Sequence, residues 1–158
     1  MRFSTIVGIF TVMLTLLPGL LFAENVIDDS KNPGYLYVLS ATSGSLKGDT
    51  LTLNGVPNVV YFTNRPARKA GHISFSQFVE MWNKGSDSYK ADPPNATLSV
   101  WKKDGAKNVV VELMSVVQKS GSVVFKVAVL EGMSPVEFKT GSLYIDLFVG
   151  DELGHIFF

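Results

Sequence analysis

The sequence predicts a mainly β protein, either an antiparallel β-sandwich or an open barrel, with one packed α-helix. Three observations predict it: short segments of alternating apolar and polar residues, turn signals between them, and a single segment of helical periodicity. The alternation is clearest in residues 123–130, where we expect Val123, Phe125, Val127 and Val129 on one face and Lys126 on the other. About seven such segments fit one antiparallel domain.

The first strands predicted are residues 35–41, 50–54 and 58–63, which are rich in aromatic, β-branched and alternating apolar residues. Residues 42–48 are small and polar, so we expect a turn there. Asn54-Gly55 is a strong tight-turn signal. Residues 64–72 contain Pro and Gly and predict a loop.

One helix is well specified. Ser74 is the expected N-cap and Gln77 lies three residues later, which is the spacing of a capping box. The apolar positions follow helical spacing and share one face: Phe75, Phe78, Val79 and Trp82. Gly85 is the expected stop signal.

After a polar loop the chain predicts an antiparallel meander. Its strands are residues 97–102, 109–117, 123–130 and 142–149, separated by turns at 103–105 and 119–121 and a longer connection over 131–140. Trp101 directly follows Val100 and breaks the alternation, which makes it the best candidate for a surface aromatic residue.

The N-terminus predicts export. Basic Arg2 precedes an apolar run of about sixteen residues, from Ile6 to Leu21, and small Ala23 follows at the expected cut, which is the order of a secretory signal peptide. We therefore expect a signal peptide over 1–23, a flexible lead-in over 24–34, one β-rich domain over 35–149 and a tail over 150–158. A retained anchor is the alternative, because Leu21 is larger than the small residue usual before a cut. No cysteine stands at the cut, so we expect no lipid anchor and a periplasmic or secreted product without a stable membrane attachment.

Charge and composition exclude several partners and cofactors. Loss of Arg2 leaves 13 basic against 14 acidic residues, a net charge of −1, which argues against nucleic acid as a partner. The chain has no cysteine, so thiol chemistry and thiolate metal sites are excluded. His72 and His155 are the only histidines and lack metal-ligand spacing. We predict neither a metal nor another cofactor.

Three blocks in order carry a family resemblance: FTNRPARKAGH at 62–72, DPPNA at 92–96 and LYID at 143–146. They resemble a group of small secreted or periplasmic proteins of uncharacterised activity, over nearly all of the expected domain. The resemblance implies export and a shared fold but supplies no activity. The chain departs from it at Asn64, where that group more often has Asp.

The densest polar cluster is the candidate ligand site. Arg65, Arg68, Lys69 and His72 stand close before the expected helix, whose N-terminus carries a positive dipole end. A small anionic ligand would fit there, and the candidate ligand-binding residues are Asn64, Arg65, Arg68, His72 and Asp92. Two alternatives remain open. In the first, Arg65 forms an ion pair with Asp92 or Asp146 that holds two loops together. In the second, the loop is simply exposed to solvent.

Other residues of these blocks are candidates for structural roles: Pro66, Gly71, Pro93, Pro94, Asn95 and Asp146. Proline and glycine suit turns and extended entries into strands. These roles need no ligand.

The leading functional hypothesis is an exported soluble binding or accessory domain that is not an enzyme. No catalytic motif such as a nucleophile elbow is present. One alternative is an envelope or extracellular hydrolase or lyase that uses His72 with Asp92 or Asp146. Another is a subunit of a larger envelope assembly that pairs with a partner protein through an edge strand such as residues 35–41.

Overall fold

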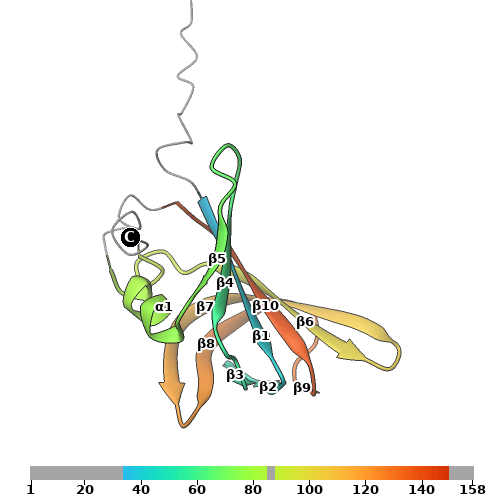
Figure 1. Ribbon diagram of the computed structural model, residues 1–158. Coiled ribbons are helices and arrows are strands. Elements are labelled where there is room, and N and C mark those ends of the chain that lie inside the picture. The colour runs from blue at the N-terminus through green and yellow to red at the C-terminus, as the bar shows by residue number, and fades with distance from the viewer. Residues whose placement is uncertain (1–33, 85–87, 150–158) are drawn as a thin grey trace, which may run out of the picture.

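The strands form a single antiparallel sheet. The computed structural model describes residues 34–84 and 88–149. Within them lie a ten-stranded sheet and one short helix, and the sheet is not closed into a barrel (Figure 1). The predicted mainly β, antiparallel fold with one packed helix is therefore confirmed. Its strands belong to one sheet rather than to the two facing sheets of a sandwich.

The order of strands across the sheet is β5-β4-β1-β10-β6-β7-β8-β3-β2-β9. The strand bounds are β1 Gly34–Ala41, β2 Ser43–Lys47, β3 Thr50–Asn54, β4 Val59–Thr63, β5 Ala70–Ile73, β6 Asn95–Lys102, β7 Gly105–Lys119, β8 Ser122–Glu131, β9 Val136–Phe138 and β10 Gly141–Val149. All strand pairs are antiparallel.

Three short strands differ from the sequence prediction. β2 lies in the expected turn 42–48, β5 lies in the expected loop 64–72, and β9 lies in the expected connection 131–140. Each has five residues or fewer and few β-branched side chains, so pairing with a neighbouring strand decides its conformation. The expected edge strand 35–41 is also corrected, because β1 lies between β4 and β10.

Helix α1, Phe75–Trp82, begins as predicted. The Ser74 hydroxyl accepts a hydrogen bond from the Gln77 backbone N–H, and the Gln77 side chain accepts one from the Ser74 N–H, which completes the capping box. The helix ends at Trp82, earlier than the predicted stop at Gly85, which lies outside the described residues. Asn83 supplies the end instead, because its side-chain amide donates to the Val79 carbonyl at 3.0 Å.

The core lies on one face of the sheet, and α1 packs against part of this face. Tyr37 on β1 and Phe125 on β8 are fully buried on this inner face. A continuous chain of aromatic rings joins them through the helix: Tyr37 to Phe78 is 5.5 Å between centroids, Phe78 to Trp82 is 5.9 Å, and Trp82 to Phe125 is 6.0 Å. The helix therefore ties strands that lie four positions apart in the sheet.

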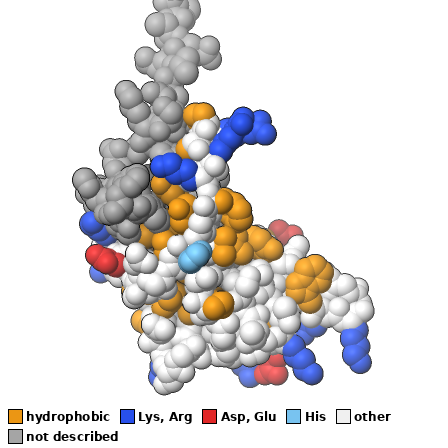
Figure 2. Space-filling view, viewed as in Figure 1, with side chains coloured by type: hydrophobic (Ala, Val, Ile, Leu, Met, Phe, Trp, Pro, Cys, Tyr) orange, Lys and Arg blue, Asp and Glu red, His pale blue; other side chains and the backbone are white. Residues whose placement is uncertain are grey.

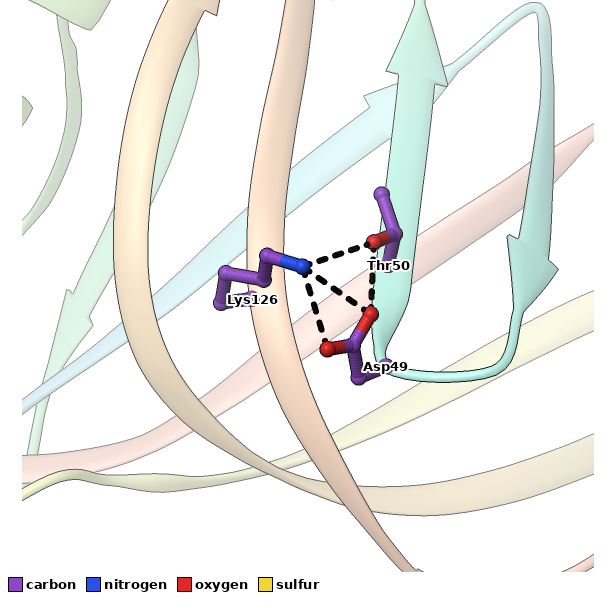
Figure 3. A network of polar contacts seen from close by, with 3 residues as sticks. All are labelled: Asp49, Thr50 and Lys126. Carbon is purple, nitrogen blue, oxygen red and sulfur yellow. Dashed lines mark hydrogen bonds and ion pairs between the residues drawn. The ribbon is translucent and has the colours of Figure 1, made fainter.

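A polar clamp holds the β2–β3 turn against β8. The Lys126 ammonium donates to both carboxylate oxygens of Asp49 at 3.0 Å, and Thr50 donates to Asp49 at 2.9 Å (Figure 3). The Asp49 backbone carbonyl also accepts from the Val127 N–H at 2.8 Å. The Lys126 side chain lowers the pKa of the exposed Asp49 carboxyl.

The expected signal peptide, lead-in and C-terminal tail lie outside the described residues. Within the part of the chain that the structure describes, no helix has the length and apolar character needed to cross a membrane.

Replacing Phe78 by Ala should lower the free energy of unfolding by about 3–5 kcal/mol, because it empties the centre of the aromatic chain. Urea denaturation measures this change. Glu80→Ala, an exposed change on the same helix, should cost less than about 0.5 kcal/mol. Equal costs for the two variants would contradict the assigned core.

Replacing Lys126 by Gln should raise the pKa of Asp49 toward its ordinary value of 3.8, because the cationic partner is lost. A pKa lowered by folding adds stability above the ordinary value, and this stability is lost as the pH falls through the folded pKa. NMR titration of the carboxyl carbon measures the shift. Lys47→Gln is the matched control, since it should raise the pKa of Glu137 and leave that of Asp49 unchanged.

Candidate functional site

The candidate residues Arg65 and Arg68 lie at the tip of the β4–β5 hairpin, which projects from the end of the sheet (Figure 1). The backbone of this tip is fixed by hydrogen bonds. The Arg68 N–H donates to the Asn64 carbonyl at 3.1 Å, and the Lys69 N–H donates to the Thr63 hydroxyl at 2.7 Å. Asn64 also joins the tip to β1, because its side-chain oxygen accepts from the Gly34 N–H at 3.2 Å.

The tip carries a concentrated positive charge. Arg65, Arg68 and Lys69 are exposed, and blue side chains stand out at this projecting end in Figure 2. The sequence has no acidic residue between Asp49 and Glu80. Within the described part of the chain, neither arginine makes an ion pair. Both guanidinium groups are therefore available to an external anion.

The tip and the helix N-terminus are separate features. The sequence placed the basic residues directly before the helix, but the four residues of β5 intervene. Four strand residues span about 13 Å. The helix N-terminus is also already satisfied by the capping box of Ser74. The combined site of basic side chains and helix dipole is thus corrected to a basic hairpin tip alone.

His72 lies away from this tip. It is exposed on β5, where it pairs with Val60 of β4, on the face opposite the core. Asp146 lies on β10, and β4 and β1 separate β10 from β5. Three strand spacings amount to about 14 Å, so the sheet holds the His72 and Asp146 backbones well beyond hydrogen-bond reach. A His72–Asp146 acid–base pair is not assembled.

The segment from Asp92 to Asn95 anchors the start of β6. Asp92 is exposed, and its N–H donates to the Ser88 carbonyl at 3.0 Å. Pro94 is buried and its carbonyl accepts from the Leu113 N–H at 2.9 Å. Asn95 then opens β6 opposite Glu112. These contacts give the segment a structural part in joining the helix connection to β7.

The remaining structural candidates lie in three different environments. Pro66 is exposed within the tip, following a cis peptide bond. The Asp146 carbonyl accepts from the Tyr89 hydroxyl at 3.3 Å. Gly71 faces the ring of Tyr61, and a Cβ at this position would lie 2.7–2.9 Å from three ring and hydroxyl atoms.

A second polar feature lies at the other end of the sheet. A cleft of about 620 Å³ opens where the end of β6 meets β2 and β9. Trp101 lines it and is 61% exposed, which confirms the predicted surface aromatic. The other lining residues carry no functional motif: Ser43, Gly44, Ser45, Asn54, Lys102, Lys103, Glu137, Phe138 and Lys139. Asn54, Lys102 and Lys103 lie in predicted strands or turns, but the cleft itself was missed because β2 and β9, which complete it, were not predicted.

Among residues 34–84 and 88–149, no group of three or more His, Cys, Asp or Glu side chains is arranged to hold a metal ion.

Replacing Gly71 by Ala should lower the free energy of unfolding by about 1–3 kcal/mol, because the new methyl group displaces the Tyr61 ring. Thermal and urea unfolding measure the change. Ala70→Ser, at the exposed neighbouring position, should have an effect within about 0.5 kcal/mol. A Gly71→Ala variant as stable as the parent would show that Gly71 has no packing role.

Comparison of the chain with models of protein families, with curated proteins and with solved structures finds no match. The resemblance to the secreted group therefore stays a prediction.

Proposed function

We propose that this chain is an exported binding domain that contacts an anionic partner through the β4–β5 tip. The observation that carries the proposal is the pair of exposed guanidinium groups of Arg65 and Arg68, which lack an ion pair among the described residues. Arginine is suited to carboxylate and phosphate groups because its planar fork donates two parallel hydrogen bonds.

The shape of the tip favours an extended partner over a small enclosed anion. The hairpin projects from the sheet (Figure 1), so its side chains meet a surface rather than surround a ligand. Its hydrogen-bonded backbone limits the conformational entropy lost on binding. The acidic face of an envelope protein is a partner of this kind, and the signal-like N-terminus supports an encounter outside the cytoplasm.

The two rival functions receive less support. The hydrolase or lyase hypothesis pairs His72 with Asp92 or Asp146, and for Asp146 the sheet places two intervening strands between the two residues. The assembly hypothesis needs a strand edge open to a partner. The outer strands are β5 and β9, which have only four and three residues, and short edges limit pairing with another chain.

Replacing Arg65 and Arg68 together by Ala should weaken binding of a hexaglutamate peptide by at least about tenfold, because two charge-assisted contacts are lost. NMR titration of the labelled protein measures the affinity, and the parent amide signals that move should be those of residues 64–69. Added salt should weaken the parent interaction.

The matched control is Lys90→Ala with Lys119→Ala, which removes the same charge at two exposed positions outside tip residues 64–69. This variant should bind like the parent. A peptide that shifts no tip signal, or that binds the two double variants equally, would refute the proposal. Far-UV circular dichroism distinguishes loss of binding from loss of the fold.

A further inference from the structure

The shape of the cleft beside Trp101 depends on the packing of one buried ring, that of Phe138, against two glycines. Phe138 of β9 is buried, and its ring lies against Gly44 of β2 and Gly141 of β10. A Cβ at Gly44 would lie 2.4 Å from the Phe138 ring, and one at Gly141 would lie 2.9 Å from it. The two glycines therefore admit the ring, which draws β9 toward the end of β6.

Further contacts fix the two sides of the cleft against each other. The Trp101 N–H donates to the Thr140 carbonyl at 3.1 Å. The Lys102 ammonium donates to the Glu137 backbone carbonyl. On the third side, the Asn54 amide donates to the Ser43 hydroxyl at 3.2 Å, and the Asn54 oxygen accepts from Ser122 at 2.7 Å. The lining is thus held in place before any ligand arrives.

The cleft has a positive balance of charge. Lys102, Lys103 and Lys139 line it against a single acidic residue, Glu137. The Glu137 carboxylate is already engaged by Lys47 at 2.6 Å. In the described part of the chain, Lys103 and Lys139 make no ion pair. The cleft therefore favours an anionic ligand although the whole protein is close to neutral.

The aromatic and hydroxyl groups narrow the ligand class. An exposed indole offers a flat apolar surface to the C–H face of a pyranose ring. Ser43, Ser45 and Asn54 offer several hydrogen-bonding groups along one wall, which suits the many hydroxyls of a sugar. The lysine ammonium groups suit a carboxylate on the same ring.

The geometry points to the Trp101 cleft as a binding site for an acidic saccharide of uronic-acid type. Trp101 is the stacking residue, Lys103 and Lys139 are the carboxylate partners, and the Ser43 wall binds hydroxyl groups. The site is independent of the basic tip. Gly34 of β1 lies beside Asn64 of the tip, whereas Ala41, at the far end of β1, pairs with Gly141 beside Phe138. About 23 Å of strand separates the two ends.

Trigalacturonic acid is the probe, and the intrinsic fluorescence of the protein is the first readout. The chain has two tryptophans, of which Trp82 is 2% exposed and Trp101 is 61% exposed. Binding should therefore shift the emission to shorter wavelength and protect the exposed fraction from acrylamide quenching. The uncharged analogue trigalactose should bind at least about tenfold more weakly, since it lacks the carboxylates.

Isothermal titration calorimetry then compares variants. Trp101→Ala should weaken binding at least about tenfold, whereas Phe62→Ala, an exposed aromatic outside the cleft, should leave it unchanged. Lys103→Gln with Lys139→Gln should weaken trigalacturonate binding and its salt dependence, and Lys90→Gln with Lys119→Gln should not.

No binding of trigalacturonate, or equal binding by the Trp101→Ala and Phe62→Ala variants, would overturn the assignment. Tighter binding of adenosine monophosphate than of trigalacturonate would also overturn it, in favour of a nucleotide site. Because Arg65 and Arg68 remain in every cleft variant, failure here leaves the result at the tip unaffected.

Discussion

The chain of aromatic rings between the helix and the sheet is the contact on which this fold depends. A single sheet has two faces, and its apolar face must be covered by another element. In the part of the chain that the structure describes, the only helix that packs on this face has eight residues. Phe78 and Trp82 compensate for this short length with large rings that reach from Tyr37 on β1 to Phe125 on β8. The chain has no cysteine, so no disulfide adds to the stability that this packing provides.

The cost of this packing is visible at Tyr37. Its ring is fully buried and its hydroxyl has no hydrogen-bond partner among the described residues. Burial and the neighbouring Tyr35 and Tyr61 raise the pKa of this phenol, so it stays neutral. An unsatisfied buried hydroxyl costs about 1–3 kcal/mol. The ring contacts with Phe78 and Tyr89 offset that cost, which indicates how much the fold depends on aromatic area at this point.

Local pattern was sufficient where a strand carries its own alternation. Residues 123–130 alternate clearly and lie within β8, and the capping box at Ser74 fixed the start of α1. Local pattern failed for β2, whose sequence SGSLK is small and polar, because its conformation comes from pairing with β3 and β9. It also failed for the place of β1 in the sheet, since strand order depends on distant segments.

Of the two candidate sites, one can be recognised from local sequence and the other cannot. Arg65 and Arg68 are visible in the sequence because they are neighbours along the chain. The cleft is not, because its lining comes from β2, β3, β6 and β9 and from the turns after β6 and β9, and the sequence marks only Trp101 among these residues as a surface aromatic. Gly44 is an example: the ring of Phe138 lies against it, and the residues around Gly44 give no sign of a contact with a residue so far along the chain.

Both sites lie where strands end, and the physical reason is general. The middle of the sheet is committed to the core on one face and to cross-strand packing on the other, so a new polar group there disturbs several neighbours. Turn residues make fewer packing contacts, so their side chains can be replaced more freely, yet the adjoining strands hold their backbone in place. The Asn64–Gly34 contact does this for the tip, and the Trp101–Thr140 contact does it for the cleft. The sheet therefore acts as a rigid support whose two ends can take different charges and ligands independently.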